Sequence, residues 1–184
     1  RTYGWTDTDP VFLEIKGRVG ATILKQRALM DRRYVPPMLA GTLPDSGDFV
    51  AAKAAHQDDL TRFRNRVDEM DLRSRLWVRY VREAYQSPFG DGARLTFDSA
   101  LEVQLPSEDA PFFPSADEWI RVPLDGPQII LEMKFNGAHP MWMFRLARRL
   151  QLFRVSCSKY VQGAMVTGHL PFASLERGHR WTAF

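Results

Sequence analysis

The chain has 184 residues, of which 45% are hydrophobic and 26% are charged, so it is long enough to bury a sizeable core, and we expect a single domain over residues 1–184. Its one cysteine excludes an internal disulfide and any multi-cysteine metal site. A single cysteine also suits a reducing compartment, so the cytoplasm is the expected location. The chain lacks an apolar stretch of the roughly 18 residues that a membrane-spanning helix requires. The net charge of +3 is too small to indicate a polyanionic partner, so the placement of the charges must decide.

The first part of the chain predicts a β-hairpin and then a helical insertion. Strands are expected at 11–19 and 22–29, and a helix is expected at about 49–66 within an insertion over residues 32–75. The chain begins with Arg1 rather than Met, and it leads directly into a strand. We therefore expect an N-terminal portion to be missing, and such a portion could carry a targeting segment.

The rest of the chain predicts a second hairpin followed by shorter elements. Strands at 76–85 and 94–104 flank a turn, and the proline-rich stretch 105–127 is expected to be a surface connection with at most a short strand. A strand is expected at 128–135. A helix is expected at 140–150, with Trp142 and Phe144 packed onto the outside of the barrel described below. A short helix or strand around 158–163 and a C-terminal extension at about 166–184 complete the chain.

Alternation along these strands puts charged side chains on one face and apolar side chains on the other. In the first strand, Glu14, Lys16 and Arg18 share one face, while Leu13 and Ile15 share the other. The same split recurs in four more segments, whose polar positions are Lys25 with Arg27, Tyr80 with Arg82, Arg94 with Thr96 and Asp98, and Glu132 with Lys134. For any single strand, the ordinary interpretation is a sheet whose polar face lies in water.

Five such strands together favour a closed barrel. Helices at 49–66 and 140–150 would cover the apolar faces, which leaves the ionic faces inside, where unpaired cations are too costly without a counter-charged ligand. The basic positions of this lumen would be Arg1, Lys16, Arg18, Lys25, Arg27, Arg82, Arg94, Lys134 and Lys159, against the acids Glu14, Asp98 and Glu132. Arginine forks and lysines suit a phosphate chain, and carboxylates among them suit Mg²⁺ or Mn²⁺.

Seven short motifs carry a resemblance to a known family. They are FLEIK at 12–16, KQR at 25–27, YVREAY at 80–85, RLTFD at 94–98, LEMK at 131–134, PMW at 140–142 and SKY at 158–160. In this order they resemble the VTC domain, the polyphosphate polymerase domain of the vacuolar transporter chaperone complex, within the triphosphate tunnel metalloenzyme superfamily. The family pattern begins earlier, with a Lys-Tyr element and a Tyr-Phe-Asp-Thr-like element that this chain lacks, so the barrel is expected to be incomplete at its N-terminus.

The resemblance implies an α+β fold, an antiparallel β tunnel barrel with helices packed on the outside. It also implies transfer of the terminal phosphoryl group of ATP onto a growing polyphosphate chain, with Mn²⁺ or Mg²⁺ as the cofactor. The residues expected to clamp the triphosphate are Lys16, Arg82, Arg94 and Lys134, and those expected to bind the rest of the substrate are Arg1, Lys25, Arg27 and Lys159. Glu132 is the expected metal ligand, and Glu14 is a weaker candidate.

Several alternatives stay open from the sequence. A tripolyphosphatase would use water as the acceptor, and a binding module would hold polyphosphate without turnover. Arg82 and Arg94 could instead pair structurally with acids such as Asp98 and Glu83, and Lys159 could be a surface lysine. The four histidines share no metal-ligand spacing, so zinc is not expected, and specific nucleic-acid binding ranks last because few aromatic side chains share the ionic face. Protein partners are not indicated.

Overall fold

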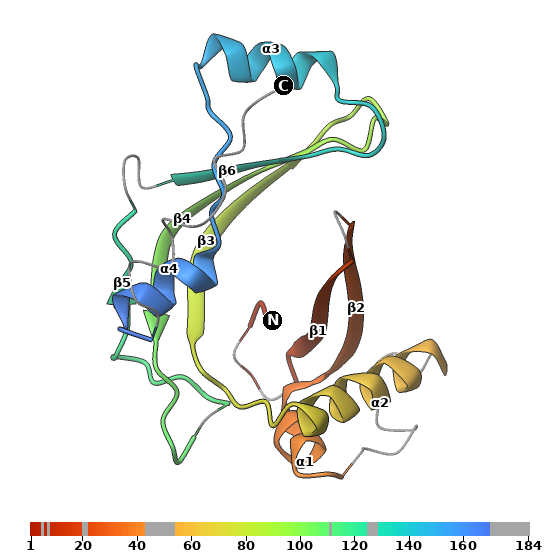
Figure 1. Ribbon diagram of the computed structural model, residues 1–184, viewed down its shortest axis with the longest axis vertical. Coiled ribbons are helices and arrows are strands. Elements are labelled where there is room, and N and C mark those ends of the chain that lie inside the picture. The colour runs from red at the N-terminus through yellow and green to blue at the C-terminus, as the bar shows by residue number, and fades with distance from the viewer. Residues whose placement is uncertain are drawn as a thin grey trace. The chain divides into compact units, whose positions relative to one another are not determined.

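The computed structural model describes residues 1–4, 6, 8–19, 22–42, 54–110, 112–124 and 129–169. The chain divides into two compact units, Arg1–Ser74 and Arg75–Phe184, each of which has its own sheet and its own helices (Figure 1). The expectation of one domain over residues 1–184 stays a prediction. Of the described helices, none combines the length and the apolar content that crossing a bilayer requires.

A two-stranded antiparallel ribbon is the centre of the first unit. β1 (Pro10–Val19) pairs with β2 (Thr22–Asp31), which confirms the first predicted hairpin. Glu14 lies opposite Arg27 and Lys16 lies opposite Lys25, so the four side chains share one face. Leu13 lies opposite Ala28, and both are buried on the other face. The predicted separation into an ionic and an apolar face is confirmed for this ribbon.

Helices pack against the ribbon. η1 (Arg32–Tyr34) and α1 (Val35–Leu39) follow β2 directly, and neither was predicted, although proline is well tolerated in the first turn of a helix, where α1 has it. α2 (Ala54–Glu69) contacts β1 and β2 and confirms the predicted helix, whose expected start near residue 49 lies outside the described residues (Figure 1). The buried core of this unit consists of Leu13, Ala28, Met30, Val35, Met38 and Leu60.

The second unit is built on a sheet with β4 (Arg94–Gln104) in the middle. β4 pairs antiparallel with β3 (Trp77–Gln86), β5 (Ile120–Arg121) and β6 (Ile129–Lys134). This confirms the second hairpin, the short strand within the proline-rich connection and the strand expected at 128–135. The α+β class with antiparallel sheets is therefore confirmed. The described strands form two separate hydrogen-bonded sheets, and their closure into a tunnel barrel stays a prediction.

One face of this second sheet is ionic at one end and apolar at the other, because β4 contains a β-bulge. The register between β3 and β4 shifts at Ala100, which has a φ of 50°. Without the bulge, Glu102 and Gln104 would lie on the same face of the sheet as the side chain of Asp98. Because of the extra residue, Leu101 and Val103 lie on that face instead, and both are buried. The bulge thus joins an apolar wall to the charged positions on a single face.

α4 (Lys159–Val166) packs on the apolar end of that face. The buried cluster beneath it consists of Leu101, Val103 and Val122. A Cβ on Gly163 would overlap the side chains of Val103 and Leu76, so glycine is what allows the close approach of the helix. The helix begins at a serine cap, where the backbone N–H of Val161 donates to Ser158 Oγ at 3.3 Å. Its first residue, Lys159, is thereby held at the boundary between the apolar and the ionic end.

The helix expected at 140–150 was predicted to cover the apolar face of the sheet, but α3 (Met141–Arg149) does not do so. Trp142 Nε1 donates to Asp91 Oδ2 at 3.0 Å, which fixes the helix to the turn between β3 and β4. Phe144, which was expected to pack onto the barrel, is 49% exposed. On the outer face of β3, Val81 and Tyr85 are 59% and 55% exposed. The prediction of an apolar face buried under this helix is therefore wrong for these residues, because α3 is fixed to the turn end of the sheet.

Candidate functional site

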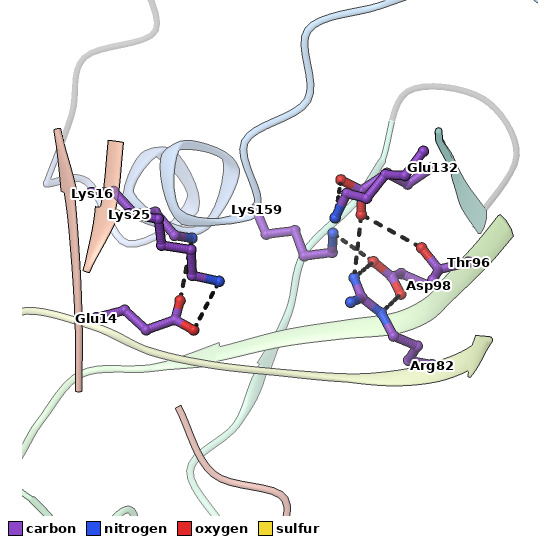
Figure 2. A network of polar contacts seen from close by, with 9 residues as sticks. Glu14, Lys16, Lys25, Arg82, Thr96, Asp98, Glu132 and Lys159 are labelled. Atoms are coloured by element: carbon purple, nitrogen blue, oxygen red, sulfur yellow. Dashed lines mark hydrogen bonds and ion pairs between the residues drawn. The ribbon is translucent and has the colours of Figure 1, made fainter. Parts of the chain in front are cut away.

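The predicted site residues gather in two clusters, one in each unit, and each is built around a carboxylate. The Glu14 cluster consists of Glu14, Lys16, Lys25 and Arg27. The Asp98 cluster consists of Arg82, Asp98, Glu132, Lys134 and Lys159. Figure 2 shows Glu14 with Lys16 and Lys25 from the first cluster, and Asp98 with Arg82, Glu132 and Lys159 from the second.

Glu14 is surrounded by three cations. Its Oε1 lies 3.0 Å from Lys25 Nζ, and its Oε2 lies 3.8 Å from Lys16 Nζ (Figure 2). The same Oε1 lies 2.6 Å from Arg27 Nη2. The carboxylate is only 11% exposed, whereas the three cations are between 40% and 66% exposed. Burial raises the pKa of Glu14, but hydrogen bonds from Lys25 and Arg27 outweigh burial and lower it. The cluster therefore holds one ionised acid beneath a basic, accessible surface.

Arg1 lies at the margin of this cluster. Its backbone nitrogen donates to the carbonyl oxygen of Phe12 at 2.7 Å. The guanidinium of Arg1 lies 4.6 Å from the centre of the Tyr3 ring, a cation–π contact. The side chain of Arg18, another predicted lumen residue, lies outside the described part of the chain.

Asp98 is the buried centre of the second cluster. Its Oδ1 accepts from Arg82 Nε at 2.6 Å, and its Oδ2 accepts from Arg82 Nη2 and Lys159 Nζ, both at 2.6 Å (Figure 2). Only 1% of its side chain is exposed. Burial alone would raise the pKa of Asp98, but the hydrogen bonds from Arg82 and Lys159 outweigh burial, so the pKa of Asp98 is lowered. The hydrogen bond with Asp98 raises the pKa of Arg82. Arg82 therefore does pair with Asp98, and Lys159 is a partner in the cluster rather than a surface lysine.

Glu132 lies beside this pair on β6. Its Oε1 is 2.9 Å from Lys134 Nζ, and its Oε2 is 3.6 Å from Arg82 Nη2 and accepts from Thr96 Oγ1 at 3.5 Å (Figure 2). Burial raises the pKa of Glu132, but the hydrogen bond from Lys134 and the neighbouring charges outweigh it and lower the pKa. Glu132 is therefore ionised at neutral pH, and its side chain is 38% exposed.

Arg94 lies at the exposed edge of the Asp98 cluster. It stands directly opposite Lys134 in the β4–β6 register, so two cations are neighbours on one face of the sheet. The alternative in which Arg94 pairs structurally with Glu83 is not among the ion pairs of the described residues, and Glu83 Oε2 instead accepts from the hydroxyl of Tyr85 at 3.0 Å. Like charges that stand opposite each other destabilise a sheet, so this pair favours an anion between or above them.

Comparison with protein-family models assigns the part of the chain that contains both clusters to a family. The model of the VTC domain matches residues 1–167. The chain belongs to the VTC domain family. This confirms the resemblance carried by the seven motifs, and it places the chain in a polyphosphate-related family associated with phosphotransferase activity. A search of curated proteins finds no match for it. All of the predicted site residues fall within the part of the chain that matches the VTC domain.

Tyr80 is a residue of this VTC domain to which the sequence assigned no role. Its ring centre lies 5.2 Å from the guanidinium carbon of Arg82 and 4.9 Å from Lys159 Nζ. Both cations of Asp98 are therefore also in cation–π contact with one ring. The spacing of Tyr80 and Arg82 along β3 puts them on the same face, which the sequence did indicate. The contact with Lys159 depends on where α4 packs, and no sequence pattern gives that.

The carboxylates of the VTC domain fit a divalent metal only in part. Among the described residues, no group of three or more His, Cys, Asp and Glu side chains is arranged to hold a metal ion. Asp98 has both oxygens bound by cations, and Glu132 contacts Lys134 and Arg82. A divalent ion at Glu132 would take one carboxylate from the protein and its other oxygen ligands from phosphate and water, a donor set that Mg²⁺ often has. The site therefore fits the metal together with a phosphate ligand.

Proposed function

We propose that this VTC domain is a metal-dependent polyphosphate polymerase, which transfers the terminal phosphoryl group of ATP to a growing polyphosphate chain. The observation that carries the proposal is the Asp98 cluster, in which β3, β6 and α4 each contribute a cation beside an ionised Glu132. Cations of this kind bind phosphate oxygens, and an ionised carboxylate among them supplies a ligand for a metal that shares those oxygens. Membership of the VTC domain family supports the same substrate class.

The reaction needs little covalent help from the protein. Phosphoryl transfer depends on aligning the acceptor with the phosphorus and on neutralising charge on the phosphate oxygens. In the proposal, Lys16, Arg82, Arg94 and Lys134 clamp the triphosphate, and Arg1, Lys25, Arg27 and Lys159 bind the acceptor end. The tunnel barrel that the resemblance implies is part of the proposal. So is the cytoplasm as the compartment, which suits a single cysteine.

Glu132 is the proposed ligand of Mn²⁺ or Mg²⁺. A bound divalent ion would neutralise phosphate oxygens and help to orient the leaving group. The ionised state of Glu132 at neutral pH supports this role, as does its partial exposure. Glu14 supports it less well, because three cations surround its carboxylate and it is nearly buried. We therefore keep Glu14 as the weaker metal candidate.

A module that binds polyphosphate without turnover is the second candidate. It is favoured by the contacts of Glu132 with Lys134 and Arg82, because a carboxylate paired with cations is a poorer metal ligand than a free one. A tripolyphosphatase is a further variant of the enzyme, in which water takes the place of the acceptor.

One incubation separates these functions. The protein is mixed with ATP and Mn²⁺, and the products are separated on a gel that resolves phosphate chains, while orthophosphate is measured in parallel. Long chains support the polymerase. Orthophosphate without chains indicates hydrolysis, and the absence of both products, together with retention of added polyphosphate, indicates a binding module. A protein that neither reacts with nor retains these polyanions contradicts the whole proposal.

A further inference from the structure

Arg82 and Lys159 are held together by two residues that are themselves absent from the proposed clamp. Asp98 binds both cations through contacts of 2.6 Å, and the ring of Tyr80 contacts both from another side. The two cations come from different elements, β3 and the first residue of α4. Two like charges do not stay adjacent without such partners, so their proximity is imposed by the surrounding structure.

The contacts use only part of the hydrogen-bonding capacity of the cations. Arg82 gives Nε and Nη2 to Asp98, which leaves its Nη1 donors outside that fork, and Lys159 gives one contact from an ammonium group with three donors. The side chains of Arg82 and Lys159 are 21% and 18% exposed, whereas Asp98 is 1% exposed. An anion therefore reaches the cations but not the carboxylate that holds them.

The geometry points to Asp98 and Tyr80 as positioning residues, which hold Arg82 and Lys159 side by side as one two-cation site for phosphate oxygens. This inference rests on the proposed function, because it assigns the geometry of the same substrate site. Fixed cations bind a phosphate group with little loss of side-chain entropy, since the ordering is already done in the free protein. The Ser158 cap and the close packing of Gly163 keep α4, and with it Lys159, in place.

If Asp98 positions the two cations, removing its charge should weaken phosphate binding, whereas simple electrostatics predicts tighter binding. Removing a negative charge near a polyanion site tightens binding if that charge is only a neighbour. We expect Asp98→Asn to weaken binding of metal-free inorganic tripolyphosphate by about tenfold, because the two cations lose the fork that orients them. Glu83→Gln is the matched control, because Glu83 follows Arg82 on the opposite, exposed face of β3 and its carboxylate accepts from the hydroxyl of Tyr85. This control is expected to bind tripolyphosphate equally well or more tightly.

Isothermal titration calorimetry with tripolyphosphate, in buffer containing a chelator, measures both variants against the wild type. Weaker binding by Asp98→Asn with unchanged or tighter binding by Glu83→Gln supports the inference. Tighter or unchanged binding by Asp98→Asn overturns it and leaves the proposed function standing. A wild-type protein that does not bind tripolyphosphate overturns the inference together with the triphosphate site of the proposed function.

A second pair of variants decides the matter if Asp98→Asn does not fold. Tyr80→Phe keeps the ring, and Tyr80→Leu removes it while leaving the Asp98 contacts in place. We expect Tyr80→Phe to bind tripolyphosphate like the wild type and Tyr80→Leu to bind it several-fold more weakly. Equal affinities of these two variants overturn the inference, because they show that the ring does not orient the cations.

Discussion

The Glu14 and Asp98 clusters share one plan, a carboxylate among several cations, but they differ in burial. The cations around Glu14 are at least 40% exposed, whereas Arg82 and Lys159 are about half as exposed or less, and Asp98 is almost fully buried. Ion pairs in water contribute little to stability, and buried pairs are costly to break. Asp98, Arg82 and Lys159 therefore form a fixed arrangement, while the exposed cations of the Glu14 cluster, like Lys134 at the edge of the Asp98 cluster, are able to exchange their acid for a ligand.

The largest expected effect is on stability and concerns the buried carboxylate. Asp98→Ala is expected to lower the free energy of unfolding by about 3–5 kcal/mol, because it leaves Arg82 and Lys159 without their partner. Glu14→Ala is expected to cost less than about 1 kcal/mol, because its cations stay in water. Denaturant unfolding followed by tryptophan fluorescence measures both variants.

A triple variant tests the cause of that loss. Replacing all three charged side chains with apolar ones, Arg82→Met with Asp98→Leu and Lys159→Met, is expected to recover much of the stability, since neither cation is then left without Asp98. Similar losses for Asp98→Ala and Glu14→Ala would show that burial does not separate the two clusters.

The next effect concerns the two metal candidates. Glu132→Ala is expected to reduce metal-dependent phosphate transfer by about 100-fold or more, because it removes the carboxylate proposed to hold the ion. Glu14→Ala is expected to change the same rate by only a few-fold. Glu83→Ala is the control, because Glu83 is an exposed acid on the opposite face of β3. Near wild-type transfer by Glu132→Ala would assign the metal role to another residue.

A smaller effect is expected at the exposed cations. Lys25→Ala and Arg27→Ala should each raise KM for the polyphosphate acceptor by a few-fold, with a smaller change in kcat, because these exposed side chains attract the acceptor without fixing it. Raising the salt concentration should reduce this difference, since exposed charges are screened. Steady-state kinetics at two ionic strengths measure the change in KM. KM values that do not depend on salt would contradict the view that the exposed cations of the Glu14 cluster exchange their acid for a ligand.

The smallest effect is a pH dependence of stability. Folding lowers the pKa of Asp98 and of Glu14, so the stabilisation from their charged forms is complete above the unfolded pKa values of about 4 and is lost as pH falls through the lower folded values. Unfolding measured between about pH 3 and pH 7 should show stability falling at the acid end. Asp98→Asn should flatten this fall more than Glu14→Gln, and an equal change in both would contradict the difference in burial.

Sequence alternation predicted which side chains share a face, because a strand alone determines that property. Glu14, Lys16, Lys25 and Arg27 were grouped in this way, and their register confirms the grouping. Alternation does not distinguish a half-exposed acid from a buried one, so the different status of Asp98 could not be read from its strand.

Other features depend on tertiary packing and were missed for that reason. Lys159 reaches Asp98 only because α4 packs closely through Gly163. Phe144 was expected to pack onto the outside of a barrel, but α3 is fixed to the β3–β4 turn through Trp142, and Phe144 is half exposed. Apolar spacing indicates that a helix has a core-facing side, and the location of that core is a property of the whole unit.

The bulge at Ala100 makes the length of β4 as important as its composition. Deleting Ala100 would remove the extra residue and leave a regular strand, in which Leu101 and Val103 still share the face of Asp98 and still lie under α4. Adding or removing one residue between Leu101 and Val103 would instead turn one of these two side chains away from α4. Natural variation in this strand is therefore expected to tolerate the loss of the bulge residue but no change of length between the two positions that support the helix.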